Sequence, residues 1–158
     1  MEKIKLFTHT DLDGIGCAIL GKLAFNNIDI EYCNYDDINK KVKDFILSKQ
    51  YDNYDHIYIT DISINEEVAE LIENTKPNTF KDGFHLNECF SLIDHHPTAL
   101  WLNKYFWANV EEETILLHFN DETEIKEKTS GTYLFFMELL SHNYLTPSKH
   151  ECLILKEF

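Results

Sequence analysis

The sequence predicts an α/β fold: a doubly wound, mostly parallel sheet with helices on both faces, in a Rossmann-like arrangement. Short runs rich in β-branched and aromatic residues alternate along the chain with segments whose apolar residues recur at helical spacing. This alternation is typical of parallel sheets, because a helix usually connects two neighbouring parallel strands. In addition, three predicted strands run directly into carboxylate or imidazole residues. Ligands of such folds bind beyond the carboxyl ends of the strands.

Three strands and three helices are predicted in the first half of the chain. The helices show apolar residues at every third or fourth position, as Val42, Phe45 and Ile46 do. Asn65 is a suitable N-cap for the third helix, with Glu66 and Glu67 in its first turn. In chain order the elements are strand Lys3–His9, helix Gly14–Phe25, strand Ile28–Asn34, helix Ile38–Leu47, strand His56–Thr60 and helix Ile64–Ile72.

The second half predicts two strands and two helices around less regular segments. The aromatic segment Ala99–Trp107 fits neither period. Its Trp101, Phe106 and Trp107 form either a core cluster or a platform on which a base stacks. The elements are strand Cys89–Ile93, strand Thr114–Phe119, a solvated loop over Asn120–Thr129, helix Ser130–His142 and a last helix opened by Thr146 and Pro147.

The composition is that of a globular domain. The 158 residues are 44% hydrophobic and 13% aromatic, which suits one domain with its own core. No apolar stretch has the length of a membrane span, and the apolar run after Met1 is too short for a signal peptide. The scattered cysteines indicate reduced core thiols and a cytoplasmic location. They are Cys17, Cys33, Cys89 and Cys152.

The charge of the chain argues against a long nucleic acid as partner. There are 28 acidic residues against 14 basic ones, and every basic residue is a lysine, so that the net charge is −14. Such a charge repels a long polyanion, because nucleic-acid binding depends on neutralising phosphates. Without arginine the chain also lacks the bidentate forks that grip phosphates. A nucleotide ligand should therefore be small.

Candidate site residues follow three of the predicted strands. His9-Thr10-Asp11-Leu12-Asp13-Gly14 closes the first strand, Asp61 the third, and Asp94-His95-His96 the fourth. Taken alone, Asp-x-Asp-Gly is a common turn or cap sequence, and a single aspartate at a strand end is ordinary. Three ionisable residues in a row after an apolar strand suit neither a core nor a turn. Together the three groups favour one site at the carboxyl edge of the sheet.

The residue types at this edge favour a divalent metal centre. Carboxylates and imidazoles without thiolates suit Mn²⁺, with Mg²⁺ or Co²⁺ as substitutes. Two ions can clamp a phosphoryl oxygen for in-line attack, and Asp61, at the end of a central strand, is placed to bridge them. Gly14 lets the backbone turn closely into the following helix, whose N-terminus favours an anion at the same edge.

The three groups, in this order, resemble motifs I, II and III of the DHH phosphoesterases. The sequences around these motifs most resemble the RecJ-like and NrnB-like oligoribonuclease branch. They are HTDLDGIGCAILGKLAF, ITDISINEE, LIDHHPTALWLN and SGTYLFFMELL. The resemblance implies that His9 and Asp11 hold a first metal ion, Asp13 and His95 a second, and that Asp61 bridges both. It also implies that His96 faces the scissile phosphate and that Asp94 orients a ligand imidazole.

The chain departs from the family pattern at two points. The family histidine often stands four residues before the first aspartate, whereas His9 stands two before Asp11. The fourth motif, an aspartate for the second metal, and the DHHA1 domain that grips the nucleotide have no counterpart. We therefore expect residues 1–158 to form a single DHH domain, truncated at its C-terminal end. A homodimer or a partner chain could supply the missing part.

Two functions follow from the resemblance. The first is a manganese-dependent phosphodiesterase, a hydrolase with a two-manganese centre that acts on short oligonucleotides or other small phosphoesters. The second is a catalytically degenerate DHH domain that binds a nucleotide or another protein. Nano-RNA, linear or cyclic dinucleotides and pyrophosphate all suit such a metal centre, so the substrate stays open.

Overall fold

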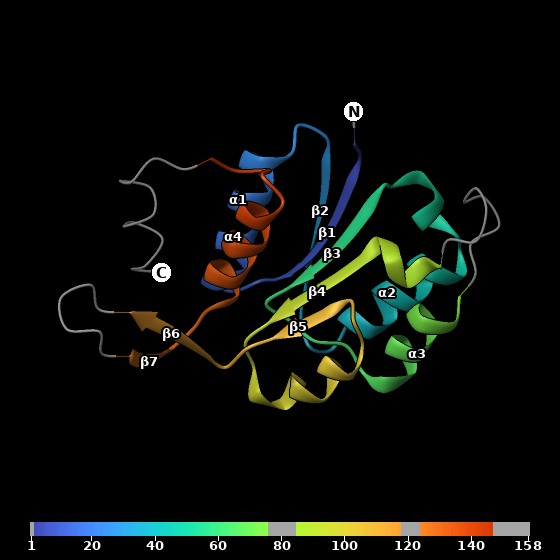
Figure 1. Cartoon of the computed structure of the whole chain (residues 1–158). Coiled ribbons are helices and arrows are strands. Elements are labelled where there is room, and N and C mark those ends of the chain that lie inside the picture. Colours follow the sequence, from blue (N-terminus) through green and yellow to red (C-terminus); the bar gives the residue numbers. More distant parts are fainter. Residues whose placement is uncertain (1, 76–84, 118–123, 147–158) are drawn as a thin grey trace.

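A five-stranded, all-parallel sheet lies at the centre of the computed structural model, which describes residues 2–75, 85–117 and 124–146 (Figure 1). The strand order is β2-β1-β3-β4-β5. The sheet confirms the predicted α/β class, because every neighbouring pair in it runs parallel. The strands are β1 (Ile4–His9), β2 (Ile28–Cys33), β3 (His56–Thr60), β4 (Phe90–Asp94) and β5 (Ala108–Val110).

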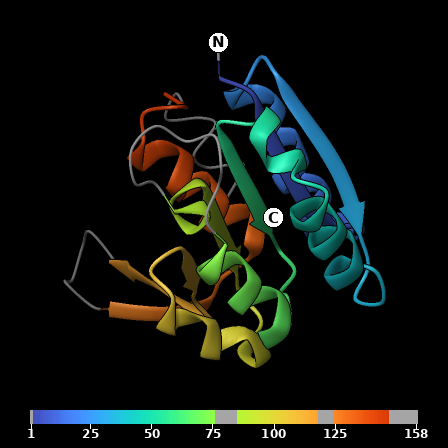
Figure 2. The same ribbon diagram turned by 90° about the vertical axis from the view of Figure 1, so that its right-hand side faces the viewer.

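Helices cover both faces of this sheet, as the sequence predicts (Figures 1 and 2). On one face α1 (Leu12–Ala24) lies beside α4 (Gly131–Ser141), and on the other α2 (Ile38–Leu47) lies beside α3 (Glu66–Asn74). Alternate residues of the strands pack into two separate hydrophobic cores, one on each face of the sheet. Leu6 packs with Phe135 of α4, whereas Phe7 packs with Phe45 of α2. The sheet is therefore buried on both sides, as parallel sheets usually are.

Side chains cap the starts of three helices. Asp11 accepts a hydrogen bond from the Gly14 amide at the start of α1. Asn65 accepts one from the amide of Val68, which confirms its predicted role as N-cap of α3. Ser130 caps α4 in the same way. Each cap satisfies one of the amide groups that a helix leaves without an internal partner, so that local sequence fixes where α1, α3 and α4 begin.

The structure differs from the prediction between β4 and α4. The aromatic segment is mainly a 3-10 helix, Pro97–Lys104, and it is followed by the unpredicted edge strand β5. The predicted loop Asn120–Thr129 was wrong over its second half, because Glu124–Lys128 forms β7, which pairs antiparallel with β6 (Glu113–Leu117). Backbone pairing with β6 holds this charged segment extended, and its composition gives no sign of that. The helix predicted from Thr146 and Pro147 lies outside the described residues.

The aromatic residues after β4 divide between core and surface. Trp107 is buried, stacks on Tyr105 and donates its indole N–H to Glu73 across 3.0 Å. Trp101 and Phe106 are exposed. Trp107 is thus a core residue, and only the other two could meet a ligand. No helix in the described ranges is long and apolar enough to cross a membrane.

The strand order places a topological switch point at the carboxyl ends of β1 and β3. The chain leaves β1 for β2 on one side and then crosses back to β3 on the other side. Sheets of this kind bind ligands where the direction of winding reverses. The start of α1 comes very close to this edge, because a Cβ atom on Gly14 would lie 2.1 Å from the carbonyl oxygen of His9. The predicted close turn at Gly14 is confirmed.

Candidate metal centre

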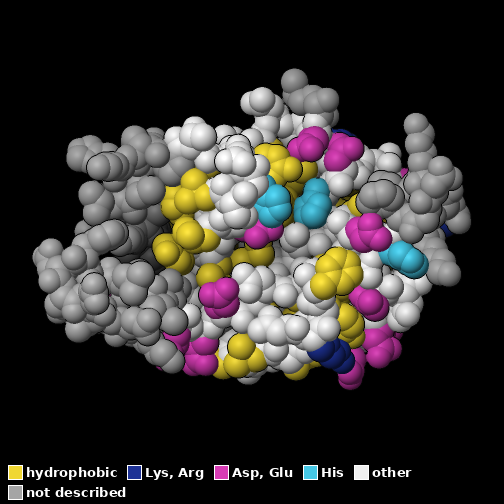
Figure 3. All heavy atoms as spheres, viewed as in Figure 1, with side chains coloured by type: hydrophobic (Ala, Val, Ile, Leu, Met, Phe, Trp, Pro, Cys, Tyr) yellow, Lys and Arg dark blue, Asp and Glu magenta, His cyan; other side chains and the backbone are white. Residues whose placement is uncertain are grey.

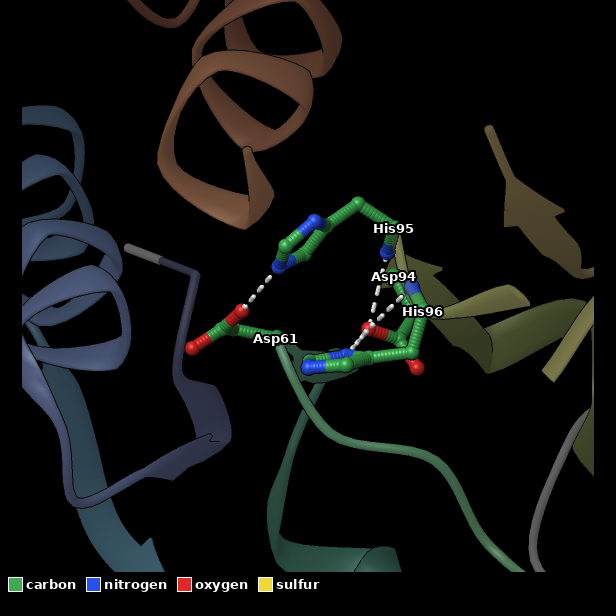
Figure 4. Close-up of side chains that lie close together, drawn as sticks. All are labelled: Asp61, Asp94, His95 and His96. Carbon is green, nitrogen blue, oxygen red and sulfur yellow. Dashed lines mark hydrogen bonds and ion pairs between the residues drawn. The ribbon is translucent and has the colours of Figure 1, made fainter. Parts of the chain in front are cut away.

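All seven residues predicted for the site lie at this carboxyl edge of the sheet. Figure 4 shows four of them, at the ends of β3 and β4, with their side chains turned toward one another. Figure 3 shows the molecular surface from the side of Figure 1, on which acidic side chains far outnumber lysines. The seven are His9 at the end of β1, Asp11 after it, Asp13 in the first turn of α1, Asp61 after β3, and Asp94, His95 and His96 at the end of β4.

Asp61 is at the centre of the group and is fully buried. Its backbone is in the left-handed region, with a φ of 58° that is unusual for a residue with a side chain. Neither carboxylate oxygen has a hydrogen bond of good geometry within the described chain. Burial raises the pKa of Asp61 to about 7. A buried carboxylate that sits on a strained backbone and lacks hydrogen bonds of good geometry is costly to keep, which points to a function.

Two imidazoles face the oxygens of Asp61. Nε2 of His95 lies 3.2 Å from Oδ1, and Nδ1 of His9 lies 3.8 Å from Oδ2. His9 comes from β1 and His95 from β4, the strands on either side of β3. The contact with Asp61 raises the pKa of His95 above its usual value. Asp61 therefore lies between the two sides of the site.

Asp11 completes the group on the side of β1. Its Oδ1 atom accepts the Gly14 amide at 3.0 Å, and its Oδ2 atom lies 2.8 Å from Nδ1 of His9. Burial raises the pKa of Asp11, but the amide of Gly14 and the nearby His9 outweigh this effect, so that the pKa is below its usual value. Asp11 is thus ionised near neutral pH and faces the same space as Asp61.

Asp13 is held by a helix that follows far later in the chain. Its Oδ2 and Oδ1 atoms accept hydrogen bonds from the amides of Gly131 and Thr132, at 2.8 and 2.7 Å. Oδ2 also lies 3.4 Å from Nε2 of His95, the atom that faces Asp61. Asp13 and Asp61 therefore approach His95 from two sides.

Asp94 organises the two histidines that follow it. Its buried Oδ1 atom accepts the amide of His95 at 2.8 Å and Nδ1 of His96 at 2.7 Å. The hydrogen bond with Asp94 raises the pKa of His96. It also fixes the imidazole of His96 with Nε2 pointing away from Asp94. The imidazole that Asp94 orients is therefore that of His96, whereas the expected ligand His95 contacts Asp94 through its backbone amide alone.

Tyr35, which the sequence reasoning did not single out, lies beside the site. Its hydroxyl is 3.3 Å from Nε2 of His96, and its ring centre is 4.8 Å from that of His9. Asn34 fixes this turn, because its side chain accepts a hydrogen bond from Thr10 at 2.7 Å. One signal was available in the sequence: Tyr35 directly follows the predicted strand Ile28–Asn34, most of which forms β2 beside β1. Gly131 and Thr132 were missed as well, although their segment was recognised as part of the resemblance.

The donor groups fit a divalent metal centre. The buried atoms without hydrogen bonds of good geometry include both oxygens of Asp61, Oδ2 of Asp94 and Nδ1 of His9. Two sets of potential ligand atoms, each set within 4.8 Å, share Asp61. The buried Cys17 thiol belongs to neither set, and burial raises its pKa. Carboxylate and imidazole donors of this kind suit Mn²⁺ and related ions. The sets are His9, Asp11 and Asp61, and Asp61, Asp94, His95 and His96.

Comparison with known proteins identifies one similar curated sequence. Over 145 residues, or 90% of this chain, the sequence is 33% identical to the oligoribonuclease NrnB of Bacillus subtilis (strain 168). The chain spans about a third of that relative, 32% of its length. No protein-family model matches the chain.

The fold is similar to that of a solved structure, an uncharacterised protein from Helicobacter pylori G27. The TM-score is 0.66, and the match covers 98% of this chain and 40% of that protein. At 18% sequence identity, the likeness concerns the fold alone.

Proposed function

We propose that this chain is a DHH-family metallophosphoesterase domain of the NrnB-like branch and that it hydrolyses short oligonucleotides or other small phosphoesters through two Mn²⁺ ions. The observation that carries the proposal is Asp61, a buried carboxylate that has no hydrogen bond of good geometry among the described residues and is shared by two sets of potential ligands. The 33% identity to an oligoribonuclease supports the reaction class. The charge of −14 favours small substrates over long nucleic acids.

The residues divide into ligands and residues that act on the substrate. His9 and Asp11 would hold one ion, Asp13 and His95 the other, and Asp61 both. Bound ions would neutralise phosphate charge and activate water.

His96 is the candidate for direct contact with the substrate. Because Asp94 takes its Nδ1 atom, Nε2 is left to face a phosphate oxygen and to donate a hydrogen bond there. Asp94 acts as a positioning residue.

The test is hydrolysis of labelled di- to pentanucleotides by the purified chain, with and without Mn²⁺. The variants are Asp61→Ala and Asp94→Ala. Asp44→Ala is the matched control, because this exposed carboxylate on α2 pairs only with Lys40 among the described contacts. We expect turnover that needs Mn²⁺ and that both site variants abolish. Absence of turnover in the parent chain, or turnover that survives both changes, would overturn the proposal. Nucleotide binding without product would instead indicate the degenerate binding domain.

A further inference from the structure

The N-terminus of α4 supplies the hydrogen-bond donors for Asp13. The amides of Gly131 and Thr132 donate to its two carboxylate oxygens, at 2.8 and 2.7 Å. They are among the first amides of the helix, which have no partner within it, and Ser130 caps the next one, Tyr133, at 3.1 Å. Two parallel hydrogen bonds fix both the position and the plane of the Asp13 carboxylate.

A third bond ties Thr132 to the backbone of α1. Its buried hydroxyl donates to the carbonyl oxygen of Asp13 at 2.7 Å. The space for this side chain exists because position 16 is a glycine: a Cβ atom on Gly16 would lie 2.2 Å from the Thr132 hydroxyl oxygen. The glycine in α1 and the threonine in α4 therefore allow the two helices to approach closely at Asp13.

Gly131 brings the same helix against Asp61. A Cβ atom at Gly131 would lie 2.6 Å from Cβ and 2.8 Å from Oδ1 of Asp61. In Figure 4 the orange-brown helix α4 approaches the group formed by Asp61 and His95. The first residues of α4 thus contact both carboxylates that face Nε2 of His95.

We infer that Gly131 and Thr132 belong to the metal centre as positioning residues, which hold Asp13 in the orientation that a metal ion needs. The inference rests on the proposed function. Each Asp13 oxygen retains a second lone pair for a ligand bond. The amides and the helix dipole stabilise its negative charge before an ion arrives. Asp61 accepts no amide hydrogen bond within the described part of the chain, so the two carboxylates have different roles: Asp13 is preorganised and Asp61 is free to bridge.

The test measures Mn²⁺ affinity from the EPR signal of free Mn²⁺, which does not depend on turnover. Thr132→Val removes the hydroxyl donor and keeps the shape of the side chain, whereas Thr132→Ser restores the hydroxyl. Loss of a hydrogen-bonding partner behind a ligand typically weakens metal binding by about 10- to 100-fold. Thr132→Val leaves both amide donors of the Asp13 carboxylate in place and removes only the hydroxyl bond to its carbonyl oxygen, so we expect Mn²⁺ binding to weaken toward the lower end of that range, by about 10-fold, and Thr132→Ser to stay near the parent. Ser141→Ala, at the far end of α4, is the control on the same helix.

A double-mutant cycle with Asp13→Asn distinguishes positioning from general damage. If Thr132 acts through Asp13, Thr132→Val should weaken Mn²⁺ binding in the parent and have little further effect in Asp13→Asn. Gly131→Ala provides a second variant if Thr132→Val does not fold, and it should also weaken binding by pressing on Asp61.

The outcomes separate this inference from the proposed function. Parent-like affinity in Thr132→Val, or additive losses in the cycle, would overturn the inference and leave the metal centre standing. A parent chain that binds no Mn²⁺ would overturn both.

Discussion

Nδ1 of His96 lies 2.7 Å from Oδ1 of Asp94, a carboxylate with no exposed surface, and the same oxygen also accepts the amide of His95. A single atom of Asp94 therefore orients His95, the proposed ligand, through its backbone and His96, the proposed substrate contact, through its ring. This pairing separates two properties that an experiment can measure independently, metal binding and turnover.

Asp94→Asn should reduce turnover more than metal binding. An asparagine oxygen can still accept a hydrogen bond, but it no longer carries the charge that holds the His96 imidazole. We expect kcat to fall by about 10- to 100-fold, the usual loss when such a partner is changed. Mn²⁺ affinity should change much less, because the candidate ligands remain. Steady-state kinetics and Mn²⁺ titration check this, and equal losses in both would contradict the assigned role.

Asp61→Asn should make the metal-free protein more stable above neutral pH. Burial raises the pKa of Asp61 to about 7, whereas 3.8 is the ordinary value. The folded chain thus binds this proton more tightly than the unfolded chain. Its free energy of unfolding falls as the pH rises from about 4 to about 7 because of this group. Asparagine cannot ionise, so the variant loses this contribution.

Thermal unfolding of metal-free Asp61→Asn and parent at pH 5 and pH 8 measures the effect. For a chain of this size, about 1 kcal/mol corresponds to a shift in Tm of about 2–4 °C. The advantage of the variant should appear at pH 8 and shrink at pH 5. A variant that is less stable than the parent at pH 8 would show that the Asp61 charge is not costly.

Mn²⁺ should bind more tightly as the pH rises through about 7. An ion must displace the proton that burial leaves on Asp61, and also the proton on His95, whose pKa is raised by Asp61. Calorimetry across pH 5.5 to 8.5, in two buffers of different ionisation enthalpy, gives the affinity and the number of protons released. An affinity that does not change over this range would mean that these groups are not ligands.

Tyr35→Phe should affect catalysis through His96 alone. The change removes the hydroxyl that lies 3.3 Å from Nε2 of His96 but keeps the ring beside His9. We expect a change in kcat/KM with unaltered Mn²⁺ affinity, whereas Tyr35→Ala should disturb both. Tyr32→Phe, on the neighbouring strand β2, is the control. If Tyr35→Phe alters Mn²⁺ affinity, the role of Tyr35 lies with His9 instead.

The central part of the fold could be predicted because the signals there are local. The strand His56–Thr60 and the helix Ile38–Leu47 have the predicted bounds, since apolar patterning alone determines them. The edge strand β5 could not be predicted, because three residues are too few to show a period. The strand β7 depends on backbone pairing with β6, and its charged residues resemble those of a loop.

The site residues at or just after strand ends could be predicted, whereas the residues that support them could not. Asp61 and Asp94 follow apolar runs, so parallel pairing brings them to one edge whatever the rest of the chain does. The partners of Asp13 lie 118 and 119 residues further along the chain. No spacing in the sequence predicts that contact, because it depends on how α4 packs beside α1.

The contact between Asp13 and α4 also bears on the order of events in folding. The first carboxylates of the site are made early during synthesis, whereas the residues that hold Asp13 come after all of the described strands. Closing so long a loop is entropically unfavourable until the intervening sheet has formed. The ability to bind Mn²⁺ should therefore appear late in folding. The rate at which Mn²⁺ binding appears would then report the rate at which α4 docks beside α1.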